Sequence, residues 1–312
     1  MIDRLVTLFG GGGFIGRYAA QQLLKREGVR VRIAQRDPRS AWFLKPLAGV
    51  GQLHFAAADI TKKETVRAAI AGSDAVVNLV GTFGRVEAIH VAGARNVAEA
   101  GKEAGAQALV HISAIGADPE ARSRYAGSKG RGEEAVRQAF PTATILRPST
   151  VFGPEDQFIN RFARIAALMP AVPVIAGDAK FQPVYAADVG RAIVETVLQP
   201  HKYGGKTYEL GGPETISMRD LNRWILEKTG RRKPLVEIPD AMAAAMAKLG
   251  GWAPGAPITW DQWLMLQDDN IVAKDAPGFA ELGISPVPLD AVAEGWLTPY
   301  RRQGRFAGRG EI

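Results

Sequence analysis

The feature that most constrains the fold is a run of glycines between a strand-like segment and a helix-like segment. Leu5–Phe9 is a short apolar run typical of a buried parallel strand, and Phe14–Lys25 has the apolar spacing of a helix. Between them, Gly10, Gly13 and Gly16 form a G-x-x-G-x-x-G pattern. We expect these glycines, in order, to make a tight turn, admit a pyrophosphate and let helix and strand pack closely. N–H groups at the helix start would then face the phosphates. A merely flexible glycine loop is the alternative.

The first half of the chain alternates strand-like and helix-like runs. Further strands are predicted at residues 29–34, 52–56, 75–80, 108–113 and 142–146, and helices at 61–71, 86–104 and 119–140. Thr61, with Glu64 three residues later, is expected to begin the first of these helices as a capping box. The alternation predicts an α/β fold, a Rossmann-type doubly wound parallel sheet with helices on both faces.

The composition of the chain changes after Arg147-Pro148, where proline and glycine become frequent. We expect a dinucleotide-binding domain over residues 1–150 and a smaller, mostly helical C-terminal region over 151–312 that faces a substrate or partner. Residues 184–199 are expected to return to the first domain. Ser217 is expected to cap a helix, with Asp220 three residues on, and further helices are predicted over 241–249 and 258–266. The last dozen residues form a basic, glycine-rich tail.

Composition excludes several kinds of site. The 312 residues include no cysteine, which excludes disulfides, thiolate nucleophiles and zinc–cysteine sites, and the four scattered histidines lack ligand spacing, so we expect no metal. The net charge of +7 favours phosphates or acidic surfaces as partners. The basic residues are not gathered on one helix, so we expect no nucleic-acid partner. Because the first strand begins within a few residues of the start, we expect no targeting peptide, and we expect no membrane span because no segment has the necessary apolar length.

The end of the second strand predicts which dinucleotide the chain holds. NAD enzymes place a carboxylate there for the adenosine ribose, but this chain has Gln35 followed by Arg36. A guanidinium can pair with a 2′-phosphate that a carboxylate would repel. We therefore expect NADP(H) rather than NAD(H), with Arg17 as a second cation. The alternative is that Arg36 points into solvent, and the adjacent Asp37 weakens its field.

Other candidate cofactor positions follow the third and fourth strands, where Asp59-Ile60 would contact adenine and Leu79-Val80-Gly81 would lie beside the pyrophosphate and ribose; ordinary turns are the alternative in both places. The full set of candidate cofactor-binding residues is Gly10, Gly12, Gly13, Phe14, Ile15, Gly16, Arg17, Arg36, Asp59, Ile60, Leu79, Val80, Gly81, Tyr125, Lys129 and Pro148.

Three residues are candidates for acid–base chemistry. Tyr125 and Lys129 are four apart, which places them on one face of a helix. A nearby ammonium favours the phenolate, so we expect Lys129 to lower the pKa of Tyr125 and let it exchange a proton with a carbonyl or hydroxyl. Ser113, at the end of the fifth strand, would hydrogen-bond the same oxygen. A surface tyrosine beside a solvated lysine is the alternative.

These residues resemble the short-chain dehydrogenase/reductase superfamily in its extended or atypical branch. By that resemblance Ser113 would orient the substrate oxygen, Tyr125 would be the acid–base residue, and Lys129 would hold the nicotinamide ribose. A closer resemblance covers nearly the whole chain and is to the nucleotide-binding accessory subunit of respiratory complex I, in its bacterial form. The segments that carry it are residues 133–137, 144–163, 182–190, 208–213, 257–262 and 268–270.

The resemblance implies a tightly held NADPH and a peripheral position on the cytoplasmic face of the bacterial inner membrane, beside the complex I subunits that deliver electrons to quinone. Phe9 stands where dehydrogenases commonly have threonine, and the segment from Gly81 to Val91 is short. Both departures favour a structural or weakly catalytic nucleotide site. The alternative is an active NADPH-dependent oxidoreductase or isomerase on a lipophilic substrate, in ubiquinone biosynthesis for example.

Apolar residues of the C-terminal region raise a further choice. The set comprises Met242, Met246, Leu249, Trp252, Trp260, Trp263, Leu264 and Leu266. They could bind a lipophilic molecule such as a quinone, or an apolar partner surface, but their helical spacing favours ordinary core packing. The basic tail could contact acidic lipid headgroups, although a solvated tail is the simpler reading.

Overall fold

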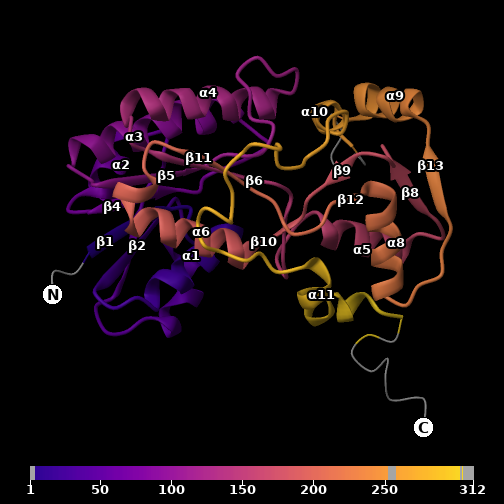
Figure 1. Cartoon of the computed structure of the whole chain (residues 1–312), viewed down its shortest axis with the longest axis horizontal. Helices are drawn as coiled ribbons and strands as arrows, with labels where there is room; N and C mark the ends of the chain where they lie inside the picture. Colours follow the sequence, from indigo (N-terminus) through magenta and orange to yellow (C-terminus); the bar gives the residue numbers. More distant parts are fainter. Residues whose placement is uncertain (1–3, 252–257, 303, 305–312) are drawn as a thin grey trace, which may run out of the picture. The chain divides into compact units, whose positions relative to one another are not determined.

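Seven parallel strands form the main sheet of the protein (Figure 1). A computed structural model describes residues 4–251, 258–302 and 304. The strand order is β3-β2-β1-β4-β5-β6-β11. The bounds are β1 (Arg4–Phe9), β2 (Val29–Gln35), β3 (Leu53–Ala57), β4 (Ala75–Asn78), β5 (Ala108–Ile112), β6 (Thr144–Pro148) and β11 (Thr207–Leu210). The predicted Rossmann-type parallel sheet is therefore confirmed, and β11 extends it beyond the predicted strands.

Helices cover both faces of this sheet, as the apolar strands require. On one face lie α1 (Phe14–Leu24) and α6 (Ala186–Leu198), which pack against each other. On the other lie α2 (Lys63–Ile70), the π-helical turn η2 (Glu87–Gly93), α3 (Ala94–Glu103) and α4 (Arg124–Ala139) (Figure 1). The 3₁₀ segment η1 (Pro38–Leu47) follows β2, and α7 (Pro200–Tyr203) follows α6. Strand side chains are buried on both faces because helices cover them both.

One local prediction in this part of the chain is wrong, the capping box at Thr61. The helix predicted from Thr61 begins at Lys63, and its N-cap is Lys62, which makes no side-chain cap. Thr61 instead donates its hydroxyl and its N–H to the Asp59 carboxylate, so the threonine is used in the turn before the helix. The predicted helix over 86–104 is present as a continuous helix, in which Glu87–Gly93 is π-helical and Ala94–Glu103 is α-helical.

The contacts divide the chain into two units. The sheet unit contains Met1–Pro148, Ala186–Leu210 and Ala273–Ser285, and the second unit contains Ser149–Tyr185, Gly211–Val272 and Pro286–Ile312. In the second unit the helices are α5 (Ile159–Leu168), α8 (Met218–Lys228), α9 (Asp240–Gly250), α10 (Trp260–Met265), α11 (Leu289–Leu297) and the 3₁₀ turn η3 (Thr298–Tyr300). Its strands pair as β10 (Val184–Tyr185) with β7 (Val151–Phe152), β12 (Ile216–Ser217) with β9 (Lys180–Phe181), and β13 (Leu235–Ile238) with β8 (Val172–Ile175).

The second unit has its own core and its predicted helix start. Phe152, Leu221 and Ala293 are among the buried side chains that form this core. The Ser217 hydroxyl accepts a hydrogen bond from the Asp220 N–H, so the predicted cap of α8 is confirmed. Among the residues that the structure describes, no helix combines the length and apolar character needed to cross a membrane.

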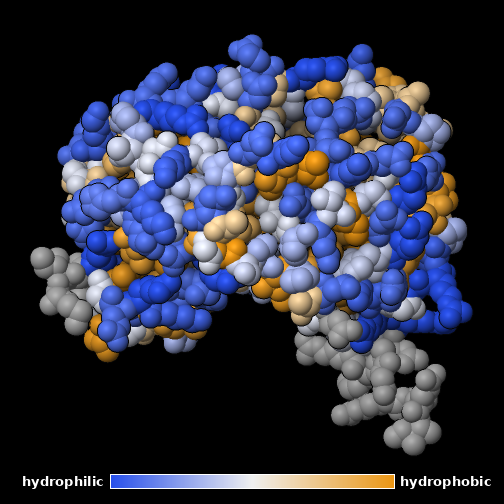
Figure 2. Space-filling view, viewed as in Figure 1, coloured by the Kyte–Doolittle hydropathy of each residue, from blue (hydrophilic) through white to orange (hydrophobic). Residues whose placement is uncertain are grey.

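The expected core packing of the C-terminal apolar residues is wrong for several of them. Met242, Met246, Leu249 and Trp260 are large and exposed, and Leu249 is 76% exposed. Figure 2 shows hydrophobic side chains on the surface over α9. The predicted helix is present as α9, but it buries Ala243 and Ala247 and leaves its larger side chains exposed to solvent. Trp252 and most of the basic tail lie outside the described residues.

Candidate functional site

The glycine turn after β1 is held by contacts that leave little room for side chains. Gly10 has a positive φ of 77°, as a tight turn requires. A Cβ on Gly16 would lie 2.4 Å from the Gly10 carbonyl oxygen and 2.7 Å from the Gly11 Cα. Gly11, which the spacing pattern leaves out, is equally restricted, because its Cβ would lie 2.7 Å from Ile33 Cδ1. The turn therefore brings the start of α1 directly against β1 and β2.

The start of α1 offers uncapped N–H groups. Gly13 is the N-cap and supplies no side-chain acceptor. Phe14 and Ile15 are the first helical residues, and such residues have no intrahelical acceptor for their N–H groups. Gly13 is exposed, whereas Gly16 is buried. This arrangement fits an anion such as a pyrophosphate, which would accept these hydrogen bonds at the positive end of the helix.

Two residues at the end of β2 have different roles: Gln35 supports the glycine turn, and Arg36 is available to a ligand. Gln35 accepts a hydrogen bond from the Gly12 N–H at 3.0 Å and donates to Ser40 Oγ at 2.7 Å, so it ties the turn to η1. Arg36 is exposed, and it contributes to the lowered pKa of Asp59. The principal cause of that lowering is the hydrogen bond from the Thr61 N–H. Arg36 thus lies in the part of the surface where β2 and β3 end.

The remaining adenosine-side candidates have structural contacts of their own. The Arg17 guanidinium lies 4.8 Å from the centre of the Phe43 ring, in a cation–π contact. Asp59 holds the turn that precedes α2. The Ile60 side chain is buried, and a Cβ on Gly93 would lie 2.6 Å from its Cδ1, so Ile60 packs in the core rather than in an open site.

The carboxyl ends of β4 and β5 bring together a second group of residues. Asn78 Oδ1 accepts from the Val80 N–H, and Asn78 Nδ2 lies 3.2 Å from His111 Nδ1. A Cβ on Gly81 would lie 3.5 Å from Lys129 Nζ. Leu79 and Val80 are half-buried, and the buried Pro148, at the end of β6, accepts from the Ile115 N–H. The backbone after β4 therefore passes beside the lysine of α4.

Ser113, Tyr125 and Lys129 are all in this part of the sheet unit. Lys129 Nζ donates to the Ile112 carbonyl oxygen at 3.0 Å and lies 5.9 Å from the centre of the Tyr125 ring. Ser113 is 3% exposed, and its Oγ has no hydrogen-bond partner within the described part of the chain. A buried hydroxyl without a partner is costly, and a ligand oxygen would satisfy it.

The expected electrostatic effect of Lys129 on Tyr125 is wrong for this structure. Burial raises the pKa of Tyr125 to about 12, where we expected the lysine to lower it. Burial also lowers the pKa of Lys129 to about 8, and Glu133 only partly offsets this. Burial disfavours the charged phenolate of Tyr125 more than attraction to the Lys129 ammonium favours it, because that ammonium is directed at a backbone carbonyl. Tyr125 therefore holds its proton at neutral pH.

Two residues around Tyr125 were not predicted. Phe83 stacks on the Tyr125 ring with centres 4.7 Å apart, and His90 meets that ring edge-on at 5.3 Å. In the sequence, His90 is one of four scattered histidines. Its position three residues before a glycine in the predicted helix carries no local signal, because its partners lie on the segment after β4 and on α4.

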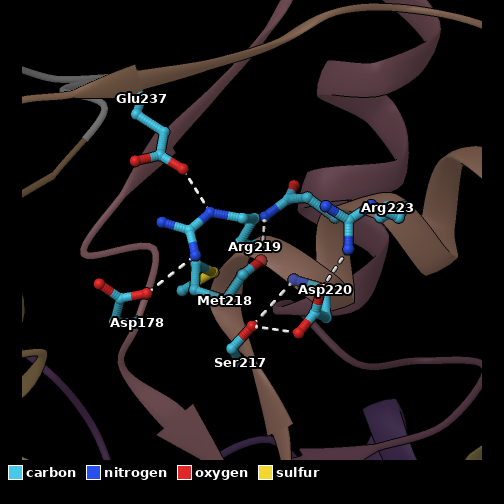
Figure 3. A network of polar contacts seen from close by, with 8 residues as sticks. Asp178, Ser217, Met218, Arg219, Asp220, Arg223 and Glu237 are labelled. Carbon is cyan, nitrogen blue, oxygen red and sulfur yellow. Dashed lines mark hydrogen bonds and ion pairs between the residues drawn. The ribbon is translucent and has the colours of Figure 1, made fainter.

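The second unit contains a separate cavity of about 520 Å³. Arg219 in its wall donates to Glu237 and to Asp178, and Asp220 accepts from Ser217 and Arg223 (Figure 3). The carboxylates in its lining are Asp178, Glu237, Asp240 and Asp269. This excess of acidic groups suits neither phosphates nor a lipophilic molecule.

No three described His, Asp or Glu side chains gather so as to hold a metal ion.

Comparisons with known proteins agree with a nucleotide-binding fold. The model of the NAD dependent epimerase/dehydratase family matches residues 6–211. NADH dehydrogenase [ubiquinone] 1 alpha subcomplex subunit 9, mitochondrial, from Mus musculus is 35% identical over 92% of this chain and 78% of its own length. The Arabidopsis thaliana protein of that name is 32% identical over 96% and 79%. A ceramide reductase from Caulobacter vibrioides is 26% identical over 80% and 78%.

Solved structures with the same fold include nucleotide complexes. An NADPH-dependent quinone oxidoreductase from Escherichia coli, complexed with NADPH, has a TM-score of 0.75 and 19% identity, over 93% of this chain and 99% of that one. A dTDP-glucose 4,6-dehydratase from Bacillus anthracis, in complex with NAD, has a TM-score of 0.66 and 17% identity, over 85% and 96%. The chain belongs to the NAD dependent epimerase/dehydratase family and, within it, to the group of the complex I alpha subcomplex subunit 9 proteins.

Proposed function

We propose that this protein binds NADP(H) across the carboxyl ends of β1, β2, β4 and β5 and serves as an accessory subunit of respiratory complex I. The observation that carries the nucleotide site is the glycine turn, in which Gly16 packs on Gly10 and the uncapped start of α1 is open to an anion. The complex I role is supported by the relatives at 32% and 35% identity, which are named as subunits of NADH dehydrogenase.

Different residues would bind different parts of the cofactor. The N–H groups of Phe14 and Ile15 would hold the pyrophosphate, and Arg36 the 2′-phosphate. On the other side of β1, Lys129 and Gly81 would meet the nicotinamide ribose, and Ser113 Oγ would bind an oxygen. When bound, the nicotinamide supplies hydride-transfer chemistry. Because Tyr125 is protonated, it would act as a proton donor, as a carbonyl reduction requires, and not as a base. A structural or weakly catalytic site is proposed because the relatives are named as subunits of NADH dehydrogenase.

A peripheral place at the membrane, on the cytoplasmic face in a bacterium and near the quinone-reducing arm, is part of this proposal. The exposed apolar side chains of α9 and α10 would contact a partner subunit or a lipophilic molecule, and the net charge of +7 suits acidic lipid headgroups. The second unit would be the partner-facing part. The unpartnered Ser113 hydroxyl favours one alternative, an active NADPH-dependent oxidoreductase or isomerase on a lipophilic substrate.

Exchanging the charge of Arg36 tests the cofactor assignment. Arg36→Glu is expected to weaken NADPH binding about 10- to 100-fold, because a charge-assisted hydrogen bond contributes about 1.5–3 kcal/mol, while NADH binding changes little. Isothermal titration of both nucleotides into protein freed of co-purified nucleotide measures the effect. Lys102→Glu is the matched control, since it makes the same charge change on an exposed residue near the end of α3. Equal NADPH affinity for the wild type and Arg36→Glu would overturn the assignment.

A further inference from the structure

His90 makes a hydrogen bond with each ring nitrogen although it is only 1% exposed. Its Nε2 accepts from the Thr82 N–H at 3.0 Å, and its Nδ1 lies 2.8 Å from Ser128 Oγ. Because Nε2 is the acceptor, Nδ1 carries the hydrogen and donates it to Ser128. Ser128 Oγ in turn donates to the Tyr125 carbonyl oxygen at 2.9 Å. The imidazole is therefore neutral and has one defined tautomer.

These bonds join two segments that are distant in the sequence. Thr82 belongs to the segment after β4 that contains Gly81 and Phe83, whereas Ser128 lies on α4 between Tyr125 and Lys129. Gly81 passes so close that its Cβ would lie 3.9 Å from His90 Nε2 and 3.5 Å from Lys129 Nζ. Burial and the Lys129 charge lower the pKa of His90 to about 3, so the pair of bonds persists at neutral pH.

The order of the strands places this junction on one half of a bound dinucleotide. β1 lies between β2 and β4, and the chain order reverses there. In such sheets the ligand lies across the reversal, with its pyrophosphate at the turn after β1. Arg36 and Asp59 follow β2 and β3, on the adenosine side. Gly81, Tyr125 and Lys129 belong to the β4 and β5 side, where the nicotinamide ribose would lie.

We propose that His90 is a positioning residue for the nicotinamide half of the cofactor. By fixing the backbone of residues 81–83 to α4, it sets the distance between Gly81 and Lys129, and thus the width of the space into which the nicotinamide ribose would fit. His90 itself touches neither the cofactor nor the reacting atoms in this assignment. The inference rests on the proposed dinucleotide site.

Two ligands that differ only in the nicotinamide half provide the test. NADPH and 2′,5′-ADP are titrated into the wild type, His90→Asn and His90→Gln after any co-purified nucleotide has been removed from each protein. Asparagine can keep the bond to Ser128 but not the one to Thr82, and glutamine the reverse. We expect each variant to bind NADPH about tenfold more weakly, the effect of roughly one lost hydrogen bond, with 2′,5′-ADP affinity within about twofold. His54→Gln, an exposed histidine on β3, is the control.

The outcomes separate the two proposals. Unchanged NADPH affinity in both His90 variants, or an equal loss for both ligands, would overturn the positioning role. A wild type that binds neither ligand would instead contradict the nucleotide site itself. If the His90 variants fail to fold, Ser128→Ala removes the same junction from α4 and leaves the imidazole intact; it is expected to give the same selective loss. If the purified protein holds NAD(H), the ligand pair becomes NADH and 5′-ADP.

Discussion

Replacing Gly16 with alanine is expected to abolish retention of the dinucleotide and to lower the free energy of unfolding by about 1–3 kcal/mol. The new Cβ would lie 2.4 Å from the Gly10 carbonyl oxygen and 2.8 Å from the Gly11 carbonyl carbon. Both are backbone atoms, so no side chain can rotate away. The start of α1 must then move off the turn, and the N–H groups of Phe14 and Ile15 lose their common direction.

Urea denaturation and the nucleotide content of the purified variant measure the two effects. Gly49→Ala is the control, because its Cβ would meet only Gln52 Oε1, at an ordinary 3.6 Å. Alanine in place of glycine stabilises a protein slightly where the backbone permits it. A Gly16→Ala protein that keeps its nucleotide would show that the turn does not hold the phosphates.

Replacing Glu133 with glutamine is expected to lower the free energy of unfolding by about 1.5–3 kcal/mol, because Arg147 loses two charge-assisted hydrogen bonds and keeps only its ion pair with Glu209 at 3.5 Å. The Glu133 side chain is 1% exposed and receives two hydrogen bonds from Arg147, both at 2.8 Å. Because Arg147 lies on β6 and Glu133 on α4, the pair fixes the helix of Tyr125 to the sheet.

A second bidentate pair serves as the control for this experiment. Arg67 donates to both oxygens of Glu103 at 2.8 and 2.9 Å, but both side chains are about half exposed. Exposed pairs contribute little because water and salt screen them, so Glu103→Gln should shift the urea midpoint far less than Glu133→Gln. Similar shifts for both variants would contradict the importance of burial at Glu133.

The sheet could be predicted because its determinants are local. Each central strand is a short apolar run, and the glycine turn joins β1 to α1 within a few residues. The capping box predicted at Thr61 does not form, because Thr61 donates its hydroxyl and its N–H to the nearby Asp59 carboxylate instead. The helical spacing of apolar residues predicted α9, but this spacing does not determine which face of the helix is buried. Ala243 and Ala247 are buried there and Leu249 is not.

The residues of the candidate site could be predicted from the sequence, but the direction of their pKa shifts could not. Tyr125 and Lys129 share a helix face, as their spacing predicts, yet the pKa of each depends on burial by distant segments. The lysine is directed at Ile112 on β5, and Phe83 covers the tyrosine ring. His90 could not be singled out, because its two hydrogen-bond partners come from separate elements.

The central claim is that an adenine dinucleotide with a 2′-phosphate lies at the turn after β1. The most direct measurement is to purify the protein, denature it, and identify the released nucleotide by mass spectrometry. We predict NADP(H) in near-stoichiometric amount. Release of NAD(H) would contradict the 2′-phosphate, and folded protein that releases no adenine dinucleotide and takes up none when NADPH is added would contradict the account as a whole.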